Sequence, residues 1–178
     1  MQRLVLSLTL FRILAAPFIF ISAIFLENYW VAFWLFNIAA LTDYFDGKLA
    51  RTYQVESRLG AILDPIGDKL LVLFAIITVI VFTQDIYVAL MGAFILAREF
   101  WVSALREYAS AHNNSQATTV TFIAKTKTTV QFIALSMYFL GSAADLALMT
   151  FLASFVLFIA VLLALKSAIE YTQNTLVR

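Results

Sequence analysis

Cysteine is absent from this 178-residue chain, and histidine, proline and glycine are scarce, at one, two and five residues. The lack of cysteine excludes disulfides and thiolate metal sites, so a metal would have to be held by oxygen atoms or by His112. So few glycine and proline residues leave no flexible linker between domains, and we find no internal repeat. We therefore expect a single domain over residues 1–178.

Charge is also scarce, because charged residues make up 13% of the chain, against about 25% in a typical soluble domain. Hydrophobic residues make up 63%, and the mean hydropathy is +0.92. The formal net charge of +1 argues against nucleic acid as a partner, because phosphate neutralisation needs a strongly basic face. The composition predicts an integral membrane protein.

Six apolar stretches are long enough to cross a bilayer as helices, which takes about 20 residues each. We expect the first to be a membrane helix and not a signal peptide, because Arg12 interrupts it and no small-residue cleavage site follows. A soluble all-α protein is the alternative, but its helices are seldom all so long and so apolar. The fold class predicted is an all-α integral membrane protein with six transmembrane helices, at Leu8 to Leu26, Tyr29 to Leu49, Leu59 to Phe82, Ile86 to Ser110, Thr119 to Leu140 and Leu146 to Glu170.

Basic residues are unevenly distributed between the two ends of these helices. Short polar breaks predict three tight turns on one side, and none of the twelve Lys and Arg residues lies in them. By the positive-inside rule, the opposite side faces the cytoplasm. Six spans then place both termini in the cytoplasm, and the compact chain suits a bacterial cytoplasmic (inner) membrane.

Four aspartates at the cytoplasmic ends of the second and third expected helices are the strongest functional signal. An aspartate at the centre of a membrane helix costs about 2.5 to 3.5 kcal/mol, so a group of four asks for a functional explanation. Helical spacing places them on two stripes that can face each other. The first stripe holds Asp43, Asp46, Gly47, Ala50 and Arg51, and the second holds Gly60, Asp64 and Asp68.

Four neighbouring carboxylates repel one another unless a positive charge joins them. Oxygen ligands without cysteine or histidine select a hard cation, Mg²⁺ or Mn²⁺, and Mg²⁺ in proteins often combines carboxylates with substrate phosphates. Arg51 offers a planar fork suited to a phosphate oxygen. The prediction is a metal site for a phosphate or diphosphate substrate; the alternative is a solvated cluster in which the acids pair with nearby Lys and Arg.

The eight positions from Asp43 to Asp68, spaced D-x2-D-G-x2-A-R-x8-G-x3-D-x3-D, resemble the signature of the CDP-alcohol phosphatidyltransferases. The resemblance implies a homodimer of six-helix subunits and two metal ions, with Mg²⁺ expected, that bind the donor CDP-diacylglycerol. The metal ligands implied are Asp43, Asp46, Asp64 and Asp68, and Asp68 would also be the general base that takes the proton of an acceptor hydroxyl. The implied donor contacts are Thr9, Gly47, Ala50, Arg51, Ser57 and Gly60.

Basic residues of the fourth and fifth helices indicate the acceptor. Arg98 and Arg106 are eight residues apart and share a helix face, and Lys125 and Lys127 open the next helix on the same side. Such a set suits the phosphate of a phosphorylated acceptor. The alternative is that these residues snorkel to lipid headgroups, with Glu99 and Glu107 neutralising the arginines locally.

Residues 97–107 and 124–128 resemble the members of this family that use sn-glycerol 3-phosphate as acceptor. The resemblance covers the chain up to about Ala134, and the last helix matches only as an apolar span. The Asn-Pro-Asn lead-in common before the first helix is absent, and Ala124 stands where glycine is frequent. The expected reaction yields phosphatidylglycerophosphate and CMP.

Two other functions remain as alternatives. A family member could use phosphatidylglycerol or an inositol phosphate as acceptor instead. An ion or metabolite transporter could also use buried carboxylates and six helices. A transporter would need a second acidic or broken-helix element in the other half of the chain, where acidic residues occur only near the expected helix ends.

Overall fold

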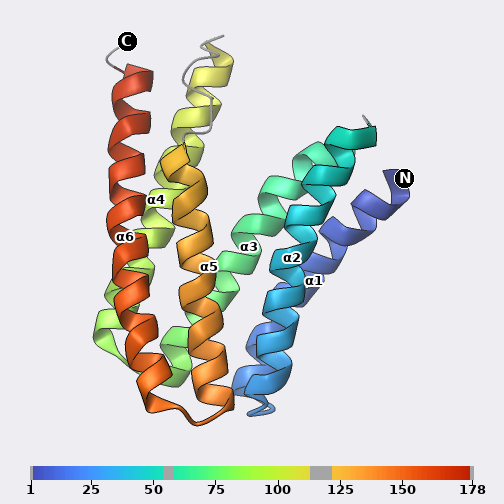
Figure 1. Cartoon of the computed structure of the whole chain (residues 1–178). Coiled ribbons are helices and arrows are strands. Elements are labelled where there is room, and N and C mark those ends of the chain that lie inside the picture. The colour runs from blue at the N-terminus through green and yellow to red at the C-terminus, as the bar shows by residue number, and fades with distance from the viewer. Residues whose placement is uncertain (1, 54–57, 113–121, 177–178) are drawn as a thin grey trace.

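In a computed structural model, the part of the chain that the structure describes folds into six α-helices (Figure 1). The structure describes residues 2–53, 58–112 and 122–176, with side chains left out at 2–5, 43–53, 58, 61, 122–125 and 176. The described part contains no strand. The helices are α1 (Gln2–Ile24), α2 (Tyr29–Tyr53), α3 (Arg58–Thr83), α4 (Ile86–Ala111), α5 (Phe122–Ala143) and α6 (Ala147–Leu176).

Three tight turns connect α1 to α2, α3 to α4 and α5 to α6 at one end of the molecule (Figure 1). Each turn has one residue with positive φ, at Glu27, Gln84 and Asp145 (φ 50°, 52° and 54°). This left-handed conformation is a common way to end a helix. Asp85 then caps α4, because its carboxylate accepts a hydrogen bond from the Tyr87 backbone N–H at 2.8 Å. The predicted turns are therefore present.

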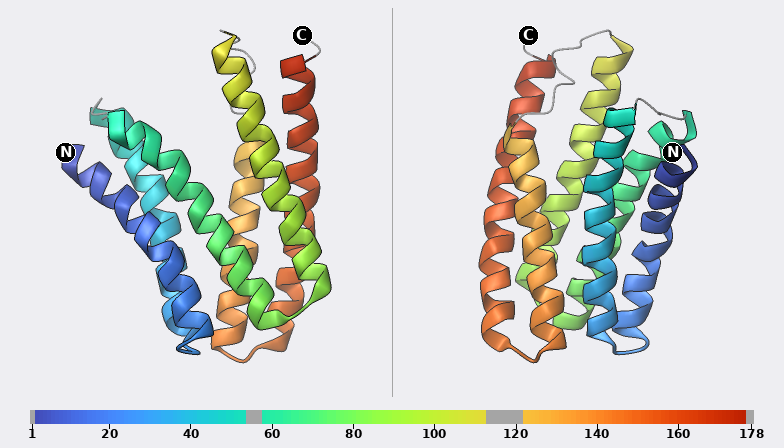
Figure 2. Two further views of the ribbon diagram at one scale, coloured as in Figure 1. Left: turned by 180° about the vertical axis from the view of Figure 1, so that it is seen from behind. Right: turned by 45° about the vertical axis from the view of Figure 1, so that its right-hand side comes forward.

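The helices form two groups of three that meet at the turn end and diverge toward the end that holds both termini (Figures 1 and 2). Within one group, α1 packs against α2 and α3, and within the other α6 packs against α4 and α5. Contacts of α2 and α3 with α5, and of α3 with α4, join the groups. A Cβ atom added to Gly92 of α4 would lie 2.6 Å from Ile76 Cγ2, so glycine permits the close approach of α3 and α4.

A mainly apolar core joins the two groups of helices. Phe36 of α2 and Phe139 of α5 are fully buried, with ring centroids 5.5 Å apart, and Phe82 of α3 packs on Phe139 at 6.0 Å. Large apolar side chains such as Phe18 and Phe155 lie outward, at 58% and 64% exposure. In the described chain, four helices are long and apolar enough to cross a membrane, and residues 29–42 of α2 form a shorter apolar stretch. An apolar exterior around an apolar core suits a multi-pass membrane protein.

Five of the six observed helices are longer than the apolar spans predicted for them, while α5 has the predicted length but ends three residues later, at Ala143 instead of Leu140. α1 begins at Gln2 instead of Leu8, α2 continues to Tyr53, and α6 ends at Leu176 instead of Glu170. The predicted bounds followed hydropathy, whereas a helix can continue with polar residues beyond the bilayer core. The polar loop predicted from Thr52 to Arg58 is therefore shorter, since Thr52 belongs to α2 and Arg58 begins α3.

Candidate active site

The start of α3 presents two of the four signature aspartates. Asp64 and Asp68 are one helical turn apart, and their side chains are 39% and 46% exposed. Gly60, one turn earlier, is buried. This confirms that α3 spans the predicted stripe. Two partly exposed carboxylates on one helix face are accessible to a ligand.

Two buried side chains of α1, one helical turn apart, bind these carboxylates. Arg12 is fully buried and pairs with both acids, through Nη1 to Asp68 Oδ1 and through Nη2 to Asp64 Oδ1, the latter at 3.4 Å. Thr9 is also fully buried, and its hydroxyl donates to Asp64 Oδ1 at 2.5 Å. A buried arginine needs such partners, because an uncompensated charge away from water is very costly. The α1–α3 packing therefore holds both aspartates in place.

Arg12 was not among the predicted site residues, although a signal for it was present. In the sequence, Arg12 argued against a signal peptide and was one of the basic residues on the cytoplasmic side, without an assigned partner. A charged residue inside an apolar span is expensive and usually has an acidic partner. Arg12 could have been matched to an aspartate on that ground, but not to Asp64 and Asp68 in particular.

The other five signature positions lie on α2. Asp43, Asp46, Gly47, Ala50 and Arg51 all belong to α2, so the predicted stripe is helical, but their side chains lie outside the described part. Ser57 lies outside the described residues altogether. Helix α1 contacts both α2 and α3, which places the two stripes in one helix group.

The residues present are of the kind that hold a hard divalent cation. Among the side chains that the structure describes, no three histidine or acidic groups come together, and Asp43 and Asp46 are not among those side chains. The described half of the predicted set, Asp64 and Asp68, offers partly exposed carboxylate oxygens. Such oxygens fit Mg²⁺ or Mn²⁺.

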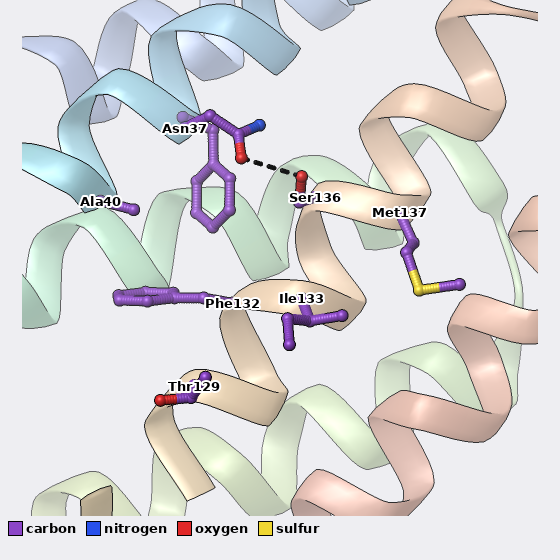
Figure 3. A pocket seen from close by; sticks show the side chains of 8 residues that line it. Asn37, Ala40, Thr129, Phe132, Ile133, Ser136 and Met137 are labelled. Atoms are coloured by element: carbon purple, nitrogen blue, oxygen red, sulfur yellow. Dashed lines mark hydrogen bonds between the residues drawn. The ribbon is translucent and has the colours of Figure 1, made fainter. Parts of the chain in front are cut away.

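A cavity of about 290 Å³ lies between α2 and α5. In Figure 3, Asn37 of α2 and Ser136 of α5 point toward one another, and the Ser136 hydroxyl donates to the Asn37 side-chain oxygen at 3.0 Å. Phe36 and Ala40, also in the lining, precede Asp43 by seven and three residues. These spacings place them on one helix face, so the cavity lies along the α2 face that leads to Asp43.

A second polar cluster joins α4, α5 and α6. Arg98 is 6% exposed, and its guanidinium donates to Glu99 at 3.2 Å and to the Ser167 hydroxyl at 2.7 Å. Lys127, 3% exposed, pairs with the same Glu99 carboxylate. The structure thus brings together two of the four predicted acceptor-binding cations, with one carboxylate between them.

Arg106 makes its contacts two turns further along α4. Its guanidinium donates to the Tyr171 hydroxyl at 2.6 Å and lies 4.9 Å from the centre of the Tyr171 ring. Lys125 belongs to α5, but its side chain is outside the described part. Ser167 and Tyr171 of α6 were not predicted, because the last helix was interpreted only as an apolar span.

The two clusters occupy the same half of the molecule. α3 and α5 begin, and α4 and α6 end, at the end of the bundle that holds both termini (Figure 1). The aspartates lie near the start of α3, Lys127 near the start of α5, and Arg106 and Tyr171 near the ends of their helices. An acidic pair and a basic cluster therefore lie on the two helix groups, toward the end where these groups diverge.

Comparison with known proteins shows which family this sequence resembles. A model of the family described as CDP-alcohol phosphatidyltransferase matches residues 6–166. The chain belongs to the CDP-alcohol phosphatidyltransferase family. It is therefore an enzyme, a phosphatidyltransferase, with an all-helical membrane fold. The matched segment contains all four signature aspartates and all four predicted acceptor-binding cations.

Curated relatives extend over most of the chain. One from Salmonella paratyphi A is 42% identical over 132 residues, covering 72% of this chain and 72% of the relative. One from Escherichia coli is 41% identical with the same coverage, and one from Cereibacter sphaeroides is 39% identical over 142 residues, covering 78% of this chain and 63% of the relative. All three are named CDP-diacylglycerol–glycerol-3-phosphate 3-phosphatidyltransferase.

Proposed function

We propose that the chain transfers the phosphatidyl group of CDP-diacylglycerol to sn-glycerol 3-phosphate, forming phosphatidylglycerophosphate and CMP. The observation that carries this proposal is that an acidic pair and a basic cluster lie in the same half of the molecule, toward the end that holds both termini. The signature aspartates on α3 suit a metal-bound diphosphate, and the buried cluster of Arg98 and Lys127 suits a second phosphate. The names of the relatives support the same donor and acceptor.

The chemistry is the displacement of CMP by an acceptor hydroxyl. The hydroxyl oxygen attacks the β-phosphorus, which bears the diacylglycerol, and the bond from that phosphorus to the oxygen shared with CMP breaks. Asp68 takes the hydroxyl proton, and Arg51 stabilises the diphosphate. Asp43, Asp46, Asp64 and Asp68 would hold two Mg²⁺ ions, which supply positive charge for the attacking and leaving oxygens.

In this proposal, Arg12 and Thr9 orient the acidic half of the site. Both are fully buried on α1 and bonded to carboxylates of α3, so they fix the direction in which Asp64 and Asp68 point. A group held in its reactive geometry loses less entropy when the substrates bind. Thr9 would then act on the donor site through Asp64.

A direct assay tests the proposed function. Purified protein in detergent, with Mg²⁺ and CDP-diacylglycerol, is expected to release CMP when sn-glycerol 3-phosphate is added. Chelation of the divalent metal is expected to stop the release, and added Mg²⁺ to restore it. Inositol phosphate and phosphatidylglycerol serve as alternative acceptors. Turnover with either of them and none with glycerol 3-phosphate would show that the acceptor assignment is wrong.

The cytoplasmic orientation of the site can be tested with single cysteines, since the native chain has none. Ala144 lies in an exposed tight turn, and His112 is exposed at the opposite end, after α4. In intact bacterial cells, a membrane-impermeant maleimide is expected to label Ala144→Cys, and to label His112→Cys only after lysis. The opposite pattern would place the site outside the cytoplasm.

We also propose that two copies of the chain form a homodimer in the bacterial inner membrane. Large apolar side chains cover the outside of the bundle, for example Phe155 on α6 at 64% exposure, and they can face either lipid or a second copy. Mass measurement of the purified protein, corrected for bound detergent, is expected to give twice the mass of one chain. A single-chain mass would contradict the dimer.

A further inference from the structure

Helix α6 holds two arginines of the basic cluster through residues just beyond the matched family segment, which ends at residue 166. Ser167 and Tyr171 lie one turn apart on one face of α6 and are 0% and 2% exposed. Ser167 accepts a hydrogen bond from Arg98 at 2.7 Å, and Tyr171 accepts one from Arg106 at 2.6 Å. Each buried hydroxyl thus binds the guanidinium of a different arginine.

The spacing of these partners bears on where the guanidinium groups lie. Arg98 and Arg106 are eight residues apart, about 12 Å along α4, whereas Ser167 and Tyr171 are four apart, about 6 Å along α6. Helical side chains lean toward the N-terminus of their own helix, so the Tyr171 hydroxyl leans toward Ser167. We therefore expect the two guanidinium groups to be closer together than their Cα atoms, within reach of one anion.

The contacts also restrict how each guanidinium can turn. Arg98 is held on two sides, by Ser167 and by Glu99, and Arg106 is held by the hydroxyl and the ring of Tyr171. The Nε atoms of both arginines are buried and have no hydrogen-bond partner in the described part of the chain. A guanidinium has five N–H donors, so both arginines keep donors for a further ligand.

We propose that Ser167 and Tyr171 are positioning residues that orient Arg98 and Arg106 toward the phosphate of a phosphomonoester acceptor. The inference rests on the proposed function and adds α6 to the acceptor site. If the guanidinium groups are already oriented before the acceptor binds, less side-chain conformational entropy is lost on binding. Loss of either hydroxyl therefore weakens acceptor binding and leaves donor binding and the chemical step intact.

Ser167→Ala and Tyr171→Phe test this role separately. Each variant is expected to raise the KM for sn-glycerol 3-phosphate about tenfold, because each removes a hydrogen bond to a charged group. The KM for CDP-diacylglycerol and kcat are expected to change less than about twofold, since both hydroxyls bond to arginines of α4 and not to the aspartates of α3. Ser167→Thr, which keeps a hydroxyl, is expected to restore the acceptor KM.

Thr172→Ala is the matched control. Thr172 accepts a hydrogen bond from the Trp101 indole N–H at 2.9 Å, so this variant breaks a bond between the same two helices without affecting an arginine. Its acceptor KM is expected to equal that of the unmodified protein. The proposal is overturned if Ser167→Ala and Tyr171→Phe leave the acceptor KM unchanged, or if Thr172→Ala raises it equally.

A failure of the proposed function would be recognised separately, because the unmodified protein would then not release CMP with glycerol 3-phosphate. In that case, the thermal unfolding midpoint with and without inorganic phosphate decides the positioning role. Phosphate is expected to raise the midpoint of the unmodified protein and to raise that of Tyr171→Phe much less. Equal shifts would overturn the inference. Tyr171→Phe keeps the ring on Arg106, so it provides a folded variant if Ser167→Ala does not fold.

Discussion

Asp68→Asn is expected to abolish turnover, with kcat lowered by about three orders of magnitude or more, while the helical fold is retained. The asparagine amide cannot take the acceptor proton, and removal of a general base typically costs 10² to about 10⁴ in rate. The fold is expected to persist because the amide oxygen can still accept from Arg12, and Arg12 also keeps its pair with Asp64. Asparagine is therefore a sharper test than alanine, which would leave buried Arg12 with fewer partners.

The measurement is CMP release under saturating substrates, together with the thermal unfolding midpoint of the same preparation. Asp145→Asn is the matched control, because Asp145 is an exposed aspartate in a tight turn at the opposite end of the bundle. It is expected to have normal turnover. If Asp68→Asn retained near-normal kcat, Asp68 would not be the general base.

Arg98→Gln is expected to raise the KM for sn-glycerol 3-phosphate about a hundredfold, since loss of one partner from a buried charge pair typically costs 2 to about 5 kcal/mol. Arg98 is bonded to both Glu99 and Ser167, and glutamine cannot supply its charge or its planar guanidinium. The fold is expected to tolerate the change, because Glu99 keeps its pair with Lys127.

Lys166→Gln separates a specific phosphate contact from general surface charge. Lys166 is exposed and precedes Ser167 on α6. Its substitution therefore removes one positive charge from the same region without changing the buried cluster. Its KM for glycerol 3-phosphate is expected to change little, and the KM for CDP-diacylglycerol is expected to be unchanged in both variants. Equal effects of the two substitutions would favour the lipid-headgroup interpretation of these basic residues.

The local features of the protein were predictable from the sequence because they depend on neighbours along the chain. Apolar length indicated six helices, short polar breaks indicated the three turns, and spacings of three and four residues placed Asp64 and Asp68 on one face. The eight-position signature led to the family that the comparison then showed. The helix ends were less accurate, since hydropathy marks where the apolar run stops and not where backbone hydrogen bonding stops.

The partners of the charged residues were decided only by the tertiary structure. Arg12 meets Asp64 and Asp68 across 52 and 56 residues, and Arg98 meets Ser167 across 69. No local spacing predicts such pairs, because they depend on which helices pack together and on how each helix is rotated about its axis. The sequence by itself thus determined the membrane helices, the α3 aspartate stripe and the family, while helix packing decided that α1 holds Asp64 and Asp68 and that α6 holds Arg98 and Arg106.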